Sequence, residues 1–167
     1  DTAISAIDDS VKQIRAIVHS LRDDGSSAAV VSRLQHETSV ARSSLGFAPS
    51  LLVTWNGEDV DKHDYNLVDD AIGSDIADDV VAVVREGLSN AARHAKASSA
   101  IVKPDVDPDQ ITIHVIDDGT GIQQTLSRRS GLSNLAARAR RYQGTFQIRP
   151  REDGQSGTEL TWQVTLR

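Results

Sequence analysis

The stretch that decides the fold is residues 85–94, which read Arg85-Glu86-Gly87-Leu88-Ser89-Asn90-Ala91-Ala92-Arg93-His94. It ends a longer segment, 76–94, in which small and apolar residues recur at helical spacing and acidic residues lie in the first turn. We therefore predict a helix over 76–94. Glu86, Asn90 and Arg93 follow one another at i, i+4 and i+7, so they share one stripe at the rim of the apolar face.

This polar stripe has the composition of a cleft wall. An asparagine offers a neutral oxygen that suits Mg²⁺, a hard cation that keeps several waters and takes its remaining ligands from phosphates. Arg93 can face the same phosphates. When the segment is taken alone, a solvated stripe with a surface pair at Arg85 or Arg93 explains it equally well.

A second motif follows the strand predicted over 110–117 and reads Asp117-Asp118-Gly119-Thr120-Gly121-Ile122. A carboxylate at a strand end can accept a hydrogen bond from the exocyclic amine of adenine, and the two glycines allow a backbone path that side chains would obstruct. The motif therefore indicates a pocket for a flat group. An ordinary Asp-Gly turn is the alternative.

Two further glycine motifs follow along the chain. Ser130-Gly131-Leu132 opens a helix predicted over 132–142, where free backbone N–H groups can hold phosphate. An ordinary helix cap is the alternative. Gly157-Thr158 opens the last predicted strand, 158–166, where glycine lets the backbone pass near a ligand. Taken alone, this second motif is only a hairpin loop.

The remaining patterns complete one α+β domain. A helix is predicted over 27–45, and strands over 50–55, 99–103 and 145–149, with a hairpin connection at 104–109 leading into the strand at 110–117. This order favours a two-layer α/β sandwich, in which helices cover one face of a mixed, mainly antiparallel sheet. Residues 56–70 give no clear pattern.

The N-terminal segment carries an apolar seam with alternating spacings of three and four, formed by Ile4, Ile7, Val11, Ile14, Val18 and Leu21. Such a seam is typical of a coiled coil or helical bundle. We predict a bundle helix within residues 1–24 and a separate domain over 25–167. A helix docked on its own domain is the alternative.

Composition excludes several classes of function. A net charge of −6 and an isoelectric point near 5.3 argue against a nucleic-acid partner. The absence of cysteine excludes disulfides and Cys-based zinc sites. No stretch approaches the roughly 20 apolar residues that span a bilayer. We therefore expect this piece itself to be soluble, and its first residue, Asp1 and not Met, suggests a fragment of a longer protein that is soluble or membrane-anchored.

The order of the four motifs resembles the histidine kinase, gyrase, Hsp90 and MutL ATPase superfamily. These motifs are Glu-x-x-x-Asn on a helix, Asp-x-Gly-x-Gly after a strand, Gly-Leu at a helix and Gly-Thr at a final strand. The pattern Arg-Glu-x-Leu-x-Asn-x-x-x-His-Ala and the short stretch 121–131 are similar to sensor kinases that act with NarL-type response regulators. They are most similar to the actinobacterial DevS and DosT type. The resemblance covers residues 50–166, and the N-terminal helix less closely.

The resemblance implies the Bergerat ATP-binding fold and a role for each motif residue. Glu86 would be the catalytic polar or basic residue near the γ-phosphate, and Asn90 would bind Mg²⁺. Arg93 and His94 would contact phosphate, and Asp117 would bind adenine. The remaining residues would shape the adenine pocket, close the lid or support the Asp117 end of the site: Gly119, Gly121, Ile122, Gly131, Leu132 and Thr158.

Two features depart from the family pattern. Arg129 stands where relatives often carry the first glycine of Gly-x-Gly-Leu, and no segment matches the acidic motif around the phosphoacceptor histidine. Residues 1–24 would be the C-terminal part of the second dimerisation and phosphotransfer helix.

The implied function is Mg²⁺-ATP binding and, in an intact dimeric kinase, phosphorylation of a histidine for relay to an aspartate of a NarL-type response regulator. The chain would associate with its own dimerisation domain and dimer partner, and alone it would not autophosphorylate. The alternatives are an anti-sigma-factor serine kinase and a nucleotide-binding regulator without transferase activity.

Overall fold

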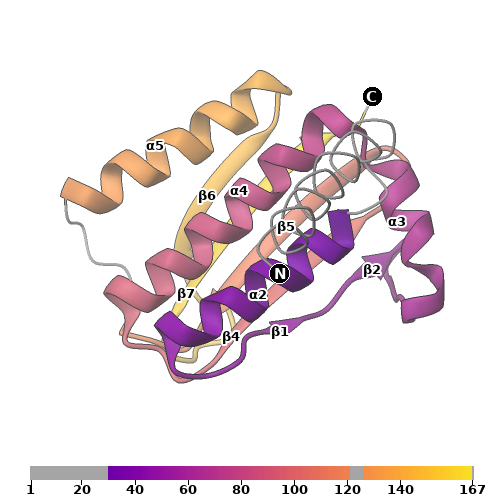
Figure 1. Ribbon diagram of the computed structural model, residues 1–167. Helices are drawn as coiled ribbons and strands as arrows, with labels where there is room; N and C mark the ends of the chain where they lie inside the picture. The colour runs from indigo at the N-terminus through magenta and orange to yellow at the C-terminus, as the bar shows by residue number, and fades with distance from the viewer. Residues whose placement is uncertain (1–29, 121–125, 167) are drawn as a thin grey trace, which may run out of the picture.

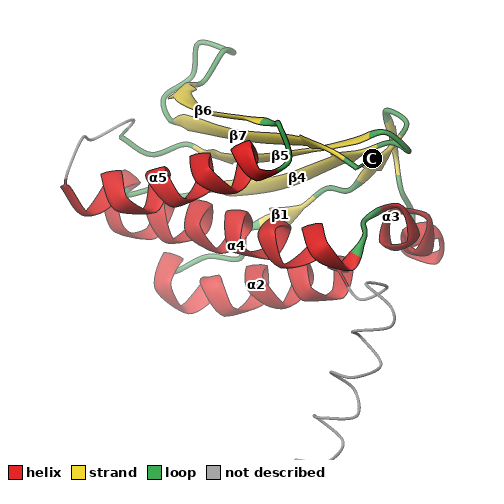
Figure 2. Ribbon diagram, turned by 90° about the horizontal axis from the view of Figure 1, so that it is seen from above, coloured by secondary structure: helices red, strands yellow, loops and turns green. Residues whose placement is uncertain are grey.

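The computed structural model describes residues 30–120 and 126–166 and folds them into two layers (Figures 1 and 2). Helices α2, α4 and α5 lie over one face of a single sheet. The helices are α2 (Val30–Leu45), α3 (Tyr65–Ala71), α4 (Ser74–Asn90) and α5 (Leu126–Arg141). The strands are β1 (Ser50–Leu51), β2 (Thr54–Trp55), β3 (Glu58–Asp59), β4 (Ala100–Val106), β5 (Gln110–Asp117), β6 (Thr145–Pro150) and β7 (Thr158–Thr165).

The sheet has the strand order β3-β2-β4-β5-β7-β6, and β1 also pairs with β4. Strands β1 and β2 run parallel to β4, whereas the other pairs are antiparallel. The predicted mixed, mainly antiparallel sheet with helices on one face is therefore confirmed.

The core lies between the sheet and the helices. Residues alternate between buried and half-buried along β5 and along most of β7, so every second side chain of these strands faces the helical layer. Trp162 of β7 is fully buried, and its indole N–H donates to the Leu135 carbonyl of α5 at 3.1 Å. This bond fastens α5 to the sheet in the middle of the helix.

The run predicted as one strand over 50–55 is two short strands, and β4 ends at Val106, three residues beyond its predicted end. Both differences have one cause. Strand β1 pairs with residues 101–102 of β4 and β2 pairs with residues 105–106, so Pro104 lies where this ladder is interrupted. Proline has no N–H to donate, and this interruption lets it lie inside a strand. The connection to β5 then shortens to residues 107–109.

Other boundaries also differ from the sequence predictions. Helix α4 begins at Ser74 and is followed by a π-helical turn over Ala91–Ala95. The stretch without a clear pattern contains β3, a 3₁₀ turn over Lys62–Asp64 and α3. The predicted bundle helix within residues 1–24 lies outside the described residues. Within the part of the chain that is described, no helix is both long and apolar enough to cross a membrane.

Candidate functional site

The site is built around Asp117, which ends β5 with a buried side chain. Its carboxylate accepts a hydrogen bond from the Gly119 N–H at 2.9 Å. Asp117 is paired in register with Thr158, the first residue of β7. The Gly119 carbonyl in turn accepts a bond from the Ser156 hydroxyl at 2.7 Å. The second and fourth sequence motifs are therefore neighbours at one end of the sheet.

Gly157 fixes this junction. Its φ is +132°, and a Cβ at this position would overlap the carbonyl oxygen of Asp117. Glycine is therefore required both by the backbone conformation and by the close approach of β5. The sequence suggested that glycine here makes room for a ligand, but the structure shows that it makes room for the backbone at Asp117.

Helix α4 lies close over β5, because Gly87 faces Val115. A Cβ at Gly87 would be only 2.8 Å from Val115 Cγ2. The end of α4 leads through the turn at 91–95 into β4, whose first residue, Ala100, is paired with Asp117. Helix α4 and strand β5 therefore end on the same side of the molecule (Figure 1), and their last residues are Asn90 and Asp117.

Two buried polar groups at this end of the molecule have unmet hydrogen-bonding capacity. Asn90 and Thr158 are 8% and 3% exposed. Neither Asn90 Nδ2 nor Thr158 Oγ1 has a hydrogen-bond partner among the described residues. Buried polar atoms in folded proteins are nearly always bonded, so an unpartnered one calls for an explanation. Arg149 Nε and Thr161 Oγ1 also lack a partner among the described residues, so it is the position of Asn90 and Thr158 at the Asp117 end of the sheet that singles them out. The unpartnered Nδ2 of Asn90 is a donor and suits a phosphate oxygen, while the amide oxygen of the same side chain is the atom that could ligate Mg²⁺.

Glu86 lies one turn before Asn90 on α4 and is half-buried. Helix α5 packs directly against Glu86: a Cβ added at Gly131 would overlap the Glu86 carboxylate. Leu132, the next residue of α5, is also half-buried. The first and third motifs are therefore brought together.

Gly131 and Leu132 do not open a helix as predicted. Helix α5 begins at Leu126, so both residues lie in its second turn, where backbone N–H groups are bonded within the helix. The expectation that their free N–H groups hold phosphate is wrong for this structure. The cause is that Leu126–Ser130 contains no proline and a single glycine costs a helix only about 1 kcal/mol, so Gly131 does not prevent the helix from starting earlier.

Arg93 is not placed with the other predicted site residues. Its guanidinium donates to the Ser89 hydroxyl, and both residues line a groove of about 180 Å³ between α2 and α4. On the same side, Arg85 is paired with Glu37 of α2 at 2.6 Å, which is the surface pair considered from the sequence. Gly121, Ile122 and the side chains of His94 and Arg129 lie outside the described residues.

Asp118 has a structural role that the sequence did not reveal. Its carboxylate accepts bonds from the backbone N–H groups of Ser98 and Ser99 at 2.7 and 2.8 Å, and from the Ser98 hydroxyl at 2.6 Å. The Ser98 hydroxyl, followed by the two N–H groups, holds the pKa of Asp118 far below its usual range. Asp118 therefore fixes the entry into β4 beside the site, while Asp117 faces the helical layer.

Comparison with known proteins places the fold in a family. Residues 75–167 match the family model described as Histidine kinase-, DNA gyrase B-, and HSP90-like ATPase. The nitrate/nitrite sensor protein NarX of Escherichia coli strain K12 is 33% identical over 101 residues, which is 59% of this chain and 17% of NarX. The sensor histidine kinase LiaS of Bacillus subtilis strain 168 is 30% identical over 105 residues, 62% of this chain and 29% of LiaS.

A third relative, the sensor histidine kinase NarS of Mycobacterium tuberculosis, is 36% identical over 75 residues, 44% of this chain and 18% of NarS. The matched regions therefore span under a third of the length of these relatives.

Two solved structures share the fold. The histidine kinase AdeS of Acinetobacter baumannii has a TM-score of 0.54 at 14% identity, covering 100% of this chain and 85% of that chain. The mycobacterial sensor histidine kinase MprB has a TM-score of 0.53 at 16% identity, covering 81% of this chain and 94% of that chain. Because the family model matches more than half of the sequence, this chain belongs to the histidine kinase-, DNA gyrase B- and HSP90-like ATPase family and contains an ATPase domain of the histidine kinase type.

Proposed function

We propose that this chain binds Mg²⁺-ATP between α4 and the Asp117 end of the sheet. The observation that carries the proposal is that two of the four buried side-chain atoms without a partner among the described residues, Asn90 Nδ2 and Thr158 Oγ1, belong to the last residue of α4 and the first residue of β7. They come from opposite layers, a helix and a strand, and both lie at the end of the sheet that Asp117 marks. A nucleotide bound there would satisfy both groups.

Each site residue then has a defined part in binding. Asp117 bonds the Gly119 N–H through one oxygen, and a carboxylate with two oxygens can also accept from the exocyclic amine of adenine. Thr158 supports this end of the pocket. Asn90 would be a protein ligand of Mg²⁺, which when bound neutralises charge on the phosphates.

Glu86 is the candidate catalytic residue. It is one turn from Asn90 and half-buried, and these two observations support assigning its carboxylate to the terminal phosphate. There it would act as the polar or basic group that orients an incoming nucleophile. Positioning of this kind, together with charge neutralisation, supplies most of the catalysis of phosphoryl transfer.

We further propose that, in an intact dimeric kinase, the γ-phosphoryl group passes to a histidine on a separate helical bundle and then to an aspartate of a NarL-type response regulator in the cytoplasm. Residues 1–24 would be the C-terminal part of the second bundle helix, and 25–167 the catalytic domain. The motif pattern over residues 85–95, the DevS- and DosT-like stretch 121–131 and the identity with NarX, LiaS and NarS support this assignment over a serine kinase.

The experiment mixes the chain, ATP labelled on the γ-phosphate and a separately supplied bundle that carries the phosphoacceptor histidine. The proposal predicts acid-labile label on the bundle histidine and none on this chain alone. A Glu86→Gln variant should transfer label more slowly while it still binds ATP. Binding of ATP without labelling of any histidine would contradict the transferase part of the proposal.

A further inference from the structure

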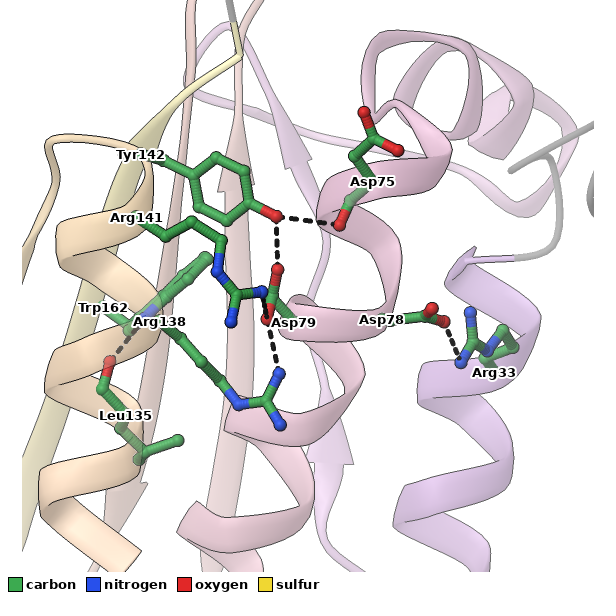
Figure 3. Close-up of polar contacts among 9 residues, drawn as sticks. All are labelled: Arg33, Asp75, Asp78, Asp79, Leu135, Arg138, Arg141, Tyr142 and Trp162. Atoms are coloured by element: carbon green, nitrogen blue, oxygen red, sulfur yellow. Dashed lines mark hydrogen bonds and ion pairs between the residues drawn. The ribbon is translucent and has the colours of Figure 1, made fainter.

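A buried carboxylate joins α4 to α5 (Figure 3), and it lies seven residues before Glu86 on α4. Asp79 of α4 is 2% exposed. It accepts hydrogen bonds from Arg138 Nη1 and from the Tyr142 hydroxyl, both at 2.5 Å, and Arg141 Nη1 lies 3.5 Å away. All three donors lie in the last turns of α5 or directly after it. We call Asp79, Arg138, Arg141 and Tyr142 the Asp79 clamp.

The clamp has little freedom to rearrange. A carboxylate without partners is very costly to bury, so Asp79 is tied to its donors. Burial, and after it the Asp79 carboxylate, raises the pKa of the Tyr142 phenol, which keeps the phenol protonated and able to donate. The Tyr142 hydroxyl also lies 2.9 Å from the Asp75 carbonyl oxygen, one turn earlier on α4.

The Asp79 clamp and the contact between Gly131 and Glu86 both join α4 to α5, at two different places along the helices. Helices α4 and α5 lie side by side and run in opposite directions (Figures 1 and 2). Glu86 follows Asp79 by seven residues on α4, and Gly131 precedes Arg138 by seven residues on α5. Seven residues are about two helical turns, or roughly 10 Å. The clamp therefore sets the register that brings Gly131 over Glu86.

We propose that Asp79 is a positioning residue for the nucleotide site, because it fixes α5 against α4 and so holds Gly131 over Glu86. This inference rests on the proposed function, since Glu86 matters only if ATP binds beside it. The bond between Trp162 and Leu135 holds the middle of α5 on the sheet, so loss of the clamp would let the helix pivot without detaching.

The test compares Asp79→Asn with Asp78→Asn in the 167-residue chain. Asp78 is the matched control because it is the neighbouring residue on α4 but is 78% exposed and is paired with Arg33 of α2 at 2.9 Å (Figure 3). Amide hydrogen exchange is measured without nucleotide at a temperature at which both variants are folded. ATP affinity is measured by calorimetry under the same conditions.

Asp79→Asn should accelerate exchange of the amides over 131–139 by about tenfold or more while those of β5 keep their protection, and it should weaken ATP binding on the order of tenfold, as for a lost hydrogen bond to a charged group. Asp78→Asn should change neither quantity. A merely stabilising role would instead accelerate exchange throughout the core.

Three results would overturn the inference: unchanged protection of α5, acceleration spread over the whole core, or loosening confined to α5 with unchanged ATP affinity. If Asp79→Asn does not fold, Arg138→Gln, which removes the half-exposed partner, is judged by the same criteria. Failure of the unaltered chain to bind ATP would contradict the proposed function itself. The exchange measurement would then still decide whether Asp79 fixes α5.

Discussion

Gly131 of α5 lies so close to Glu86 of α4 that no side chain fits between them. An alanine at position 131 would displace the Glu86 carboxylate, which is the flexible end of its side chain, and would leave the backbone in place. Gly131→Ala should raise the free energy of unfolding by up to about 1 kcal/mol, because glycine weakens a helix interior. It should slow phosphoryl transfer by roughly 10- to 100-fold, because the displaced group is the candidate catalytic residue.

Urea unfolding and the labelled-ATP transfer assay measure these two effects separately. Gly46→Ala is the control with the opposite pattern, since Gly46 has a φ of +82° and nothing within 4 Å of an added Cβ. It should lower stability and leave transfer unchanged. A Gly131→Ala variant with an unaltered transfer rate would disprove the role given to this contact.

Asn90→Ala should abolish the Mg²⁺-dependent part of ATP affinity while it leaves binding in EDTA unchanged. The reason is that the Asn90 amide is the protein ligand assigned to the ion. Alanine removes this amide, whose Nδ2 has no partner among the described residues, without leaving another polar group unpaired in its place. Calorimetric titrations with and without Mg²⁺ measure the difference. Ser89→Ala is the matched control, because the neighbouring hydroxyl bonds Arg93 on the α2 side of the helix. Undiminished Mg²⁺ dependence in Asn90→Ala would refute the metal assignment.

Gly87→Ala should destabilise the fold and weaken ATP binding, because the added Cβ would be 2.8 Å from Val115 Cγ2 and would push α4 away from β5. Overpacking of this kind costs about 1–3 kcal/mol. A double-mutant cycle with Val115→Ala, read by urea unfolding, isolates the clash. The double variant should recover part of the loss, and strictly additive losses would speak against this packing.

His114 should make stability depend on pH. On the face of the sheet opposite the helices, its Nε2 lies 3.1 Å from Asp105 and its Nδ1 3.1 Å from Glu159. The hydrogen bond with Asp105 is the main cause of a raised His114 pKa, which burial opposes. Because the folded pKa lies above the unfolded value of about 6.5, this stabilisation is complete below that pH and is lost as the pH rises through the folded pKa.

Urea unfolding between pH 5.5 and 8.5 measures this dependence. His114→Gln should remove it, whereas His36→Gln, at an exposed position of α2, should keep it. If the free energy of unfolding changed with pH equally in the unaltered chain and in His114→Gln, His114 would not be the source of the pH dependence.

The parts of the fold that could be predicted are those with a long, regular pattern. Alternation over 110–117 and 158–166 and helical spacing over 76–94 each recur often enough to define an element. The start of α5 could not be predicted, because residues 123–131 carry no apolar period and Gly131 looks like a boundary. The division of the 50–55 run follows from pairing with β4 on either side of Pro104, which is a tertiary effect.

In the candidate site, too, the sequence motifs predicted some features, and others depend on tertiary packing. The motif order predicted that Asn90, Asp117 and Thr158 gather, but not that Arg93 turns toward Ser89. Asp79 could not be singled out, because the first turns of α4 also hold other acidic residues, and a helix dipole explains them all. Only the packing of α5 buries this one carboxylate.

Calorimetric titration with Mg²⁺-ATP measures whether Asp117 anchors ATP in this chain. The unaltered chain should bind one ATP, and Asp117→Asn should weaken binding by about 10- to 150-fold, since a hydrogen bond to a charged group contributes about 1.5–3 kcal/mol. Asp118→Asn is the control, because that carboxylate bonds Ser98 and Ser99 instead: it should lower stability, while the ATP affinity of the folded variant should stay within about twofold. Equal affinities of the unaltered chain and Asp117→Asn, or no binding by either, would show that Asp117 does not anchor ATP.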